Sequence, residues 1–151
     1  MAQEQKPVKV TADLKKNRLY MTVAGNINAK MLQKLYTDIR FCVADLKEGF
    51  EVLSDVSQCN ILYVTGMSTY KKIIDFLIDN QVGVIVKIIN DDNLSYKQLA
   101  NFFRIISDED SRYEQLPNRT LYAHSQEEAE QKIEEFAKQR GITPTESPQD
   151  G

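Results

Sequence analysis

The chain has few of the residues from which catalytic and metal sites are built. It contains one histidine, His124, and two cysteines, Cys42 and Cys59, and it has no tryptophan. Neither a histidine pair at metal-binding spacing nor a Cys-x-x-Cys motif occurs, and a protein metal site needs a set of such ligands. The six glycines form no phosphate-binding loop, and no Gly-x-Ser-x-Gly motif is present. We therefore expect no catalytic residue, no metal and no cofactor, which argues against an enzyme.

Basic clusters and long apolar runs are also missing. The 19 lysines and arginines stand against 22 aspartates and glutamates, and the net charge of −3 does not favour binding to nucleic acid phosphates. No apolar run approaches the ~18 residues of a membrane span, and the segment before Val8 has no signal-peptide core. These absences predict a cytoplasmic protein without a nucleic-acid partner or a membrane span, in which both cysteines remain free thiols.

The single histidine does not change this expectation. His124 lies between the last predicted strand and its helix, shortly before Glu127 and Glu128. It could in principle act as an acid or a base, but without a second histidine a solvated or capping role fits the pattern better. We assign it no catalytic role.

The hydrophobic pattern alternates between the period of a strand and the period of a helix. Apolar residues alternate with polar ones on both sides of a turn at Lys15-Lys16-Asn17, which is typical of a hairpin. Later apolar residues recur at helical spacing between short apolar runs. The predicted elements are strands over 8–14 and 19–23, a helix between the Asn28 cap and Gly49, a strand over 50–55, a helix introduced by Gly66, a strand over 82–89, a helix over 99–106, a strand over 119–123, and a helix between the Ser125–Glu128 capping box and Gly141.

This order predicts an α/β protein with one mixed five-stranded sheet and four helices. Strands joined by a single helix run parallel, so the sheet has an antiparallel N-terminal hairpin and parallel strands elsewhere. Residues 8–140 would form one domain, with a flexible N-terminus over 1–7 and a disordered C-terminal tail over 141–151. The residues expected in the core are Leu35, Ile39, Ile73, Leu77, Val84 and Val86.

One short motif resembles a known family. A strand that ends at Asp55-Val56-Ser57 is followed by Thr65-Gly66-Met67 at a helix start. This is similar to the STAS domain, the sulfate-transporter and anti-sigma-factor-antagonist module, in which Asp-Leu-Ser ends a strand and Asp-Ser-Ser-Gly-Leu opens a helix. Thr65, Gly66 and Met67 match the last three positions, whereas Tyr63 and Val64 replace the loop aspartate and the first serine. The predicted element order also matches over 8–140, with a closer likeness to a bacterial SpoIIAA-like subgroup that lacks the loop serines.

The resemblance implies a non-enzymatic regulatory or scaffold module that binds a protein partner around Thr65–Tyr70. It also implies a phosphorylation switch, for which Thr65 is the first candidate acceptor and Ser68 the second. Phosphate at a helix start is stabilised by free backbone amides and the helix dipole. The candidate site residues are Asp55, Ser57, Thr65, Gly66, Met67, Ser68 and Thr69.

The same residues also have ordinary structural interpretations. An aspartate that closes a strand, such as Asp55, commonly accepts hydrogen bonds from the next loop, and Ser57 fits a turn. Thr65, Ser68 and Thr69 are residue types that any helix start favours as caps. The pattern favours capping alone over a site for an anion or a modification as the explanation of the hydroxyl cluster.

A second function is consistent with the predicted fold. A sheet covered by helices can hold a small apolar or lipid-like ligand, but such a pocket needs about 300 Å³ or more. A filled core would favour the docking module instead. Phe102 and Phe103 are adjacent on a predicted helix and cannot both face the core fully, so one of them could border a groove or the interface of a homodimer. The pattern favours burial of both against the margin of the sheet.

Overall fold

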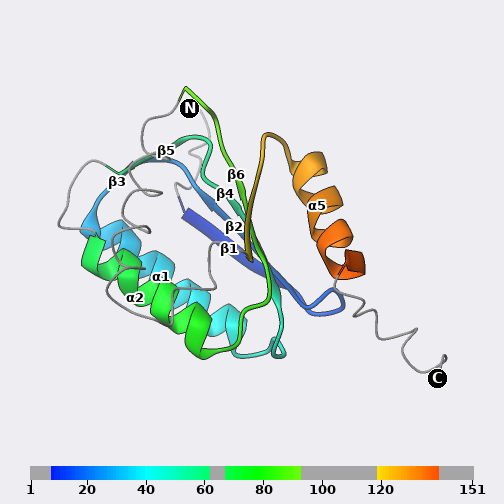
Figure 1. Cartoon of the computed structure of the whole chain (residues 1–151). Coiled ribbons are helices and arrows are strands. Elements are labelled where there is room, and N and C mark those ends of the chain that lie inside the picture. The colour runs from blue at the N-terminus through cyan, green and yellow to red at the C-terminus, as the bar shows by residue number, and fades with distance from the viewer. Residues whose placement is uncertain (1–7, 62–66, 93–118, 140–151) are drawn as a thin grey trace, which may run out of the picture.

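The computed structural model describes residues 8–61, 67–92 and 119–139, in which helices cover both faces of a sheet (Figure 1). The strands and helices follow the order predicted from the hydrophobic pattern, with two short strands added. The elements are β1 (Val8–Asp13), β2 (Arg18–Val23), β3 (Gly25–Ile27), α1 (Ala29–Val43), β4 (Glu51–Asp55), β5 (Cys59–Ile61), α2 (Met67–Asp79), β6 (Ile85–Ile88), β7 (Thr120–Ala123) and α5 (Gln126–Gln139).

The main sheet of the described residues has five strands in the order β1-β2-β4-β6-β7. β1 pairs antiparallel with β2, whereas β2, β4, β6 and β7 run parallel. Crossovers through α1 and α2 return the chain to the same edge of the sheet, which makes β2, β4 and β6 parallel neighbours. The predicted α/β class and mixed five-stranded sheet are confirmed.

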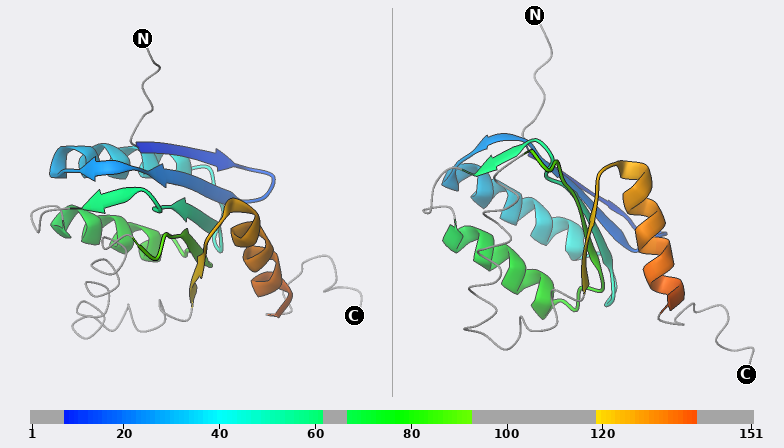
Figure 2. Two further views of the ribbon diagram at one scale, coloured as in Figure 1. Left: turned by 90° about the horizontal axis from the view of Figure 1, so that it is seen from above. Right: turned by 45° about the horizontal axis from the view of Figure 1, so that its top comes forward.

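The helices form one layer on each face of the sheet. α1 and α2 pack side by side on one face, and α5 lies on the other (Figure 2). Each face has its own cluster of buried apolar side chains. The core prediction is confirmed, because every predicted residue has at most 4% of its surface exposed: Leu35, Ile39, Ile73, Leu77, Val84 and Val86.

α1 begins where the sequence predicts but ends earlier. Asn28 is its N-cap, and the side-chain oxygen accepts a hydrogen bond from the backbone N–H of Met31 at 2.9 Å. The helix ends at Val43 rather than near Gly49. Leu46 lies in the turn that follows, and its backbone N–H donates a hydrogen bond to the carbonyl of Val43 at 2.9 Å. The helical spacing of apolar residues thus continued into a turn, which periodicity alone does not distinguish from helix.

The predicted strand over 82–89 is shorter in the structure, although the whole run is buried. Gly83 lies before β6, and its N–H donates to the carbonyl of Phe50 at 2.7 Å. A Cβ on Gly83 would lie only 2.6 Å from the carbonyl oxygen of Gly49. The two backbones can approach this closely only because position 83 has no side chain.

A two-stranded parallel sheet formed by β3 and β5 was not predicted. The sequence analysis assigned neither Gly25–Ile27 nor Cys59–Ile61 to a strand. The pairing of β3 with β5 is extended by a hydrogen bond from the N–H of Gly25 to the carbonyl of Gln58 at 2.7 Å. Three-residue strands are too short to show an alternating pattern, so periodicity does not reveal them.

The start of α5 uses the predicted capping residues in a modified arrangement. The Ser125 hydroxyl accepts a hydrogen bond from the N–H of Glu128 at 3.1 Å, as in a capping box. The Glu128 carboxylate reaches one residue further back than expected and accepts from the N–H of His124 at 2.8 Å. This hydrogen bond lowers the pKa of the Glu128 carboxyl group, with a further contribution from nearby Lys132.

The described residues contain three helices, α1, α2 and α5, rather than the predicted four. The helix expected over 99–106, including Phe102 and Phe103, lies outside the described residues. So do the expected flexible N-terminus over 1–7 and the expected disordered tail over 141–151.

Candidate functional site

The candidate residues that the structure describes lie at the edge where the parallel strands end, here called the carboxyl edge. In open α/β sheets, ligand sites gather outside this edge. β3 and β5 extend beyond it, beside the starts of α1 and α2 (Figures 1 and 2). The Asp55–Ser57 turn and the first turn of α2 therefore belong to the same end of the molecule.

Asp55 and Ser57 form a hydrogen-bonded turn after β4. One Asp55 carboxylate oxygen accepts from the Ser57 hydroxyl at 2.7 Å and from the Ser57 backbone N–H at 3.0 Å. This is the side-chain turn that Asp favours at the end of a strand. The structural interpretation of Asp55 explains its position, and Ser57 uses its hydroxyl within the turn.

The start of α2 presents its hydroxyl residues differently. Ser68 is exposed, whereas Thr69 is buried, with 6% of its surface exposed. Met67 is the first residue of α2. Thr65 and Gly66 lie outside the described residues. Of the described hydroxyl residues in this first turn, Ser68 is the one that a partner or a kinase can reach.

Both cysteines are free thiols, as predicted. Cys59 is buried in β5, and burial raises the pKa of its thiol to about 12. Cys42 is partly buried beside β1, and its thiol sulfur lies 3.9 Å from the carbonyl oxygen of Val10. Burial also raises the pKa of the Cys42 thiol, and the negative charges of Asp38 and Asp45 raise it further. Neither thiol is activated as a nucleophile, because the thiolate is disfavoured at both positions.

A lysine that the sequence analysis did not select lies inside the core. Lys87 belongs to β6 and has 8% of its surface exposed. Its Nζ donates a hydrogen bond to the hydroxyl of Tyr70 on α2 at 3.2 Å. The two side chains line an apolar cavity of about 50 Å³ between the sheet and α2, together with Ser54 on β4. A sequence signal existed, since Lys87 is the one charged residue in the apolar run 82–89.

Burial lowers the pKa of Lys87 to about 7. The cause is desolvation, because an ammonium group loses its hydration when it is enclosed by apolar side chains. At neutral pH a substantial fraction of the folded protein thus carries an uncharged amine at this position. Such an amine is a nucleophile and a base, unlike an exposed lysine at the same pH.

The lowered pKa predicts that stability rises with pH above neutrality. Between pH 7 and the ordinary lysine pKa of ~10.4, the unfolded chain holds a proton on Lys87 that the folded chain has released. The free energy of unfolding should therefore increase by about 2 kcal/mol between pH 7 and pH 8.5. Urea denaturation at both pH values measures this. Lys87→Met should remove this rise of the unfolding free energy with pH, whereas Lys72→Met, at an exposed position, should keep it. An equal rise in the wild type and both variants would contradict the attribution to Lys87.

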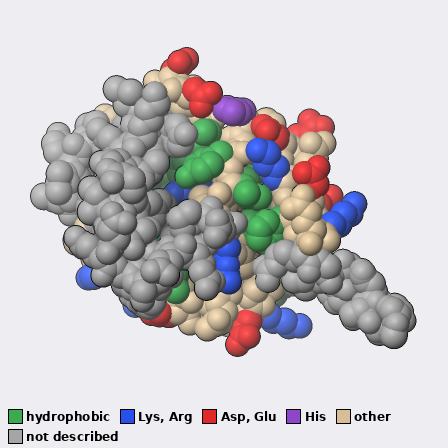
Figure 3. All heavy atoms as spheres, in the orientation of Figure 1, with side chains coloured by type: hydrophobic (Ala, Val, Ile, Leu, Met, Phe, Trp, Pro, Cys, Tyr) green, Lys and Arg blue, Asp and Glu red, His purple; other side chains and the backbone are tan. Residues whose placement is uncertain are grey.

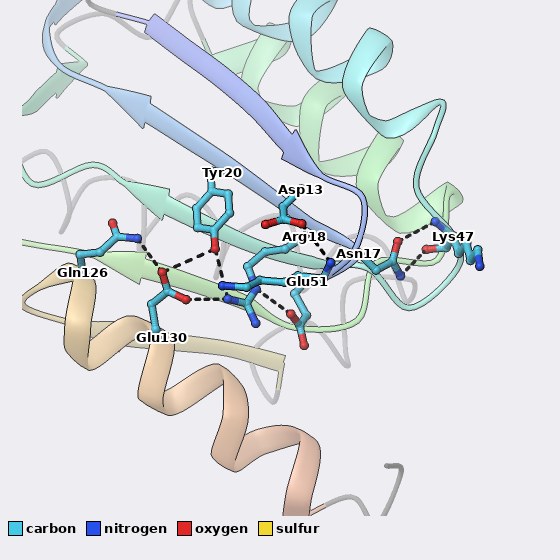
Figure 4. Close-up of polar contacts among 9 residues, drawn as sticks. Asp13, Asn17, Arg18, Tyr20, Lys47, Glu51, Gln126 and Glu130 are labelled. Atoms are coloured by element: carbon cyan, nitrogen blue, oxygen red, sulfur yellow. Dashed lines mark hydrogen bonds and ion pairs between the residues drawn. The ribbon is translucent and has the colours of Figure 1, made fainter. Parts of the chain in front are cut away.

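A second buried cation holds α5 to the sheet (Figure 4). Arg18 in β2 has 6% of its side chain exposed and pairs with Glu51 in β4 at 2.8 Å and with Glu130 in α5 at 2.6 Å. The guanidinium also donates to the hydroxyl of Tyr20 at 3.2 Å, and Gln126 donates to Glu130 at 2.9 Å. The cluster joins β2, β4 and α5 at the first residues of β2 and β4, which is the end opposite to the carboxyl edge, and its ion pair with Glu130 connects α5 to the sheet.

The guanidinium of this cluster remains charged. Burial lowers the pKa of Arg18, but hydrogen bonds to Glu51 and Tyr20 and the charge of Glu51 outweigh burial and raise it overall. The sequence analysis missed this cluster because its acidic members lie far along the chain, with Glu130 following Arg18 by 112 residues. Such a pair has no local pattern.

His124 occupies the position that its sequence context suggests. It is exposed at the start of α5, and its ring nitrogens lie 3.2 Å from a carboxylate oxygen of Asp91 and 3.8 Å from one of Glu128. Figure 3 shows the histidine at the upper rim beside acidic side chains. The described residues contain no cluster of histidine, cysteine and acidic side chains suited to hold a metal ion.

Comparison with known proteins adds no family assignment. No protein-family model matches the chain, and no curated protein is significantly similar to it. Within the described ranges, every helix is too short or too polar to cross a bilayer.

Proposed function

We propose that the protein is a non-enzymatic regulatory or scaffold module of the STAS type that binds a protein partner at the carboxyl edge. The partner would contact the Asp55–Ser57 turn and the start of α2 around Thr65–Tyr70. The element order, the antiparallel hairpin followed by parallel strands, and the motif at Asp55 and Thr65 support this proposal.

The observation that carries the proposal is the construction of the carboxyl edge. The Asp55 carboxylate fixes the turn after β4, and the β3–β5 pairing ties that turn to the start of α1. Exposed Ser68 lies at the neighbouring helix start. A surface held by such contacts loses little conformational entropy on binding, which suits a docking site.

The size of the cavity disfavours a lipid-like ligand as the alternative. The cavity of about 50 Å³ is well below the ~300 Å³ at which ligand pockets begin. A bound lipid would require α1 or α2 to move away from the sheet, at the expense of buried apolar contacts.

A phosphoswitch and the cellular location belong to the proposal. Thr65 remains the first candidate acceptor and Ser68 the second, because a phosphate at either position would reverse the local charge of the docking surface. The free cysteines favour a reducing compartment such as the cytoplasm. A second copy of the chain is one partner that the surface could take.

The proposal predicts that a bulky charge at the start of α2 abolishes partner binding. Ser68→Arg should lower the recovery of a bound protein at least about tenfold, equivalent to ~1.4 kcal/mol, since it places a long cation in the contact surface. The measurement is affinity capture from native cytoplasm with quantitative mass spectrometry, followed by titration of the purified partner.

Matched variants separate the outcomes. Gln131→Arg adds the same charge to an exposed position of α5, on the other side of the sheet, and should bind as well as the wild type. Thr65→Asp and Thr65→Val should differ in partner affinity if phosphorylation regulates docking. Equal capture by Ser68→Arg and Gln131→Arg would refute docking at this edge.

A further inference from the structure

The α1 and α2 side of the sheet carries polar side chains in the middle of an apolar face. Met21, Ser54, Lys87 and Tyr122 are register partners on four adjacent strands, so they form a row across the sheet on one face. Ser54 and Lys87 are both buried, with 6% and 8% of their surfaces exposed. Neither is needed to fill an apolar core, and each costs free energy to bury.

Lys87 and Ser54 line the cavity that separates this row from α2. Its other lining side chains are mostly aliphatic, and Tyr70 closes the polar end with its hydroxyl 3.2 Å from Lys87 Nζ. Tyr70 is only partly buried. The volume of about 50 Å³ is several times the ~10–15 Å³ that one water occupies on this measure. It suits a molecule of a few heavy atoms.

The chemistry of the lining selects the class of that molecule. The aliphatic walls accept a short hydrocarbon chain, and the polar lining residues are Lys87, Tyr70 and Ser54, of which Lys87 and Tyr70 are hydrogen-bonded to each other. Desolvation leaves much of the Lys87 population uncharged at neutral pH, which makes Nζ a nucleophile toward carbonyl carbon. The Tyr70 hydroxyl can donate a hydrogen bond to the carbonyl oxygen at the point of attack.

We propose that the cavity binds short-chain aldehydes or ketones and that Lys87 captures them as an imine. The amine nitrogen adds to the carbonyl carbon, and the carbon–oxygen bond then breaks. The carbonyl oxygen leaves as water, carrying both amine protons, and a carbon–nitrogen double bond remains. No electrons are gained or lost overall, so the step needs no oxidant, reductant or cofactor. The site shares Tyr70 with the proposed docking surface, but the capture step needs no bound protein partner.

The test is reductive trapping on the full folded chain. Propanal is added at pH 7 in a small molar excess with cyanoborohydride, and the alkylated lysines are identified by peptide mapping. Lys87 should be labelled at least about tenfold faster than any exposed lysine, since a hydrated lysine amine, with a reference pKa of ~10.4, is almost fully protonated at this pH. In urea this preference should disappear, because the pKa shift depends on the fold.

Variants define what supports and what overturns the proposal. Lys87→Met should lose the rapid adduct, whereas Lys72→Met, at an exposed position of α2, should retain it. Tyr70→Phe keeps the ring and removes the hydroxyl, and it should slow trapping several-fold. Labelling spread evenly over the exposed lysines, or a wild-type Lys87 peptide that stays unmodified in the folded protein, overturns the proposal without recourse to any variant.

Discussion

Replacing Val86 with aspartate should prevent the protein from folding. Val86 is completely buried in β6, where it packs in one cluster with Ala129 and Ile133 of α5. The substitution would place a carboxylate among apolar side chains at a cost of several kcal/mol. A domain has only about 5–15 kcal/mol of total stability. Far-UV circular dichroism and thermal denaturation should show that the cooperative transition is lost.

The matched control introduces the same residue into a strand at an exposed position. Thr11 lies in β1 and is exposed, so Thr11→Asp should keep the cooperative transition with a stability change of less than about 1 kcal/mol. If Val86→Asp instead unfolded cooperatively with a melting temperature near that of the wild type, Val86 could not be buried between β6 and α5.

Removing the Arg18 guanidinium should cause the second largest loss of folding stability. Arg18→Met keeps much of the side-chain volume but leaves the Glu51 and Glu130 carboxylates without their cation. Breaking a buried ion pair at one partner costs about 3–5 kcal/mol. Both glutamates reach some solvent, with 21% and 29% of their side chains exposed, which favours the lower end of that range. Urea denaturation should show a loss of about 3 kcal/mol with an unchanged m-value.

An exposed pair provides the comparison for Arg18. Lys34 lies 2.9 Å from Asp38 one turn along α1, with 65% of the lysine side chain exposed. Lys34→Met should change stability by no more than about 0.5 kcal/mol. A similar small loss for Arg18→Met would mean that the two glutamates find other partners and that the cluster does not hold α5.

The spacing of apolar residues along the chain was sufficient to predict the main strands and helices of this fold. The alternating residues before and after Lys15-Lys16-Asn17 gave the hairpin, and helical spacing gave α1, α2 and α5. The apolar run 82–89 gave β6, an interior strand of the sheet, and identified Val86 as core. These features were predictable because each is repeated several times along a short stretch of chain.

The features that the sequence did not predict depend on contacts between distant segments. β3 and β5 are defined by their pairing rather than by a local pattern. The Arg18 cluster joins β2, β4 and α5, and no short window of sequence contains its members. At the candidate site, the sequence located the Asp55–Ser57 turn but could not distinguish exposed Ser68 from buried Thr69, which are adjacent on α2.

Lys87 illustrates a different reason for a missed residue. A lysine in an apolar strand can lie at an exposed edge, extend its amine to solvent, or be enclosed. The sequence does not separate these cases, because the outcome depends on whether a helix covers that face. Here α2 covers it, and Tyr70 meets the amine.

The contact between Arg18 and Glu130 has a consequence for synthesis of the protein on the ribosome. The two residues are 112 positions apart, so this contact cannot form until nearly the whole described chain has been made. Until α5 docks, the face of the growing sheet that contains Leu53 and Val86 remains uncovered. Such apolar surface promotes association between nascent chains and recruits chaperones. The late arrival of α5 thus defines the interval in which the newly made protein is most at risk of aggregation.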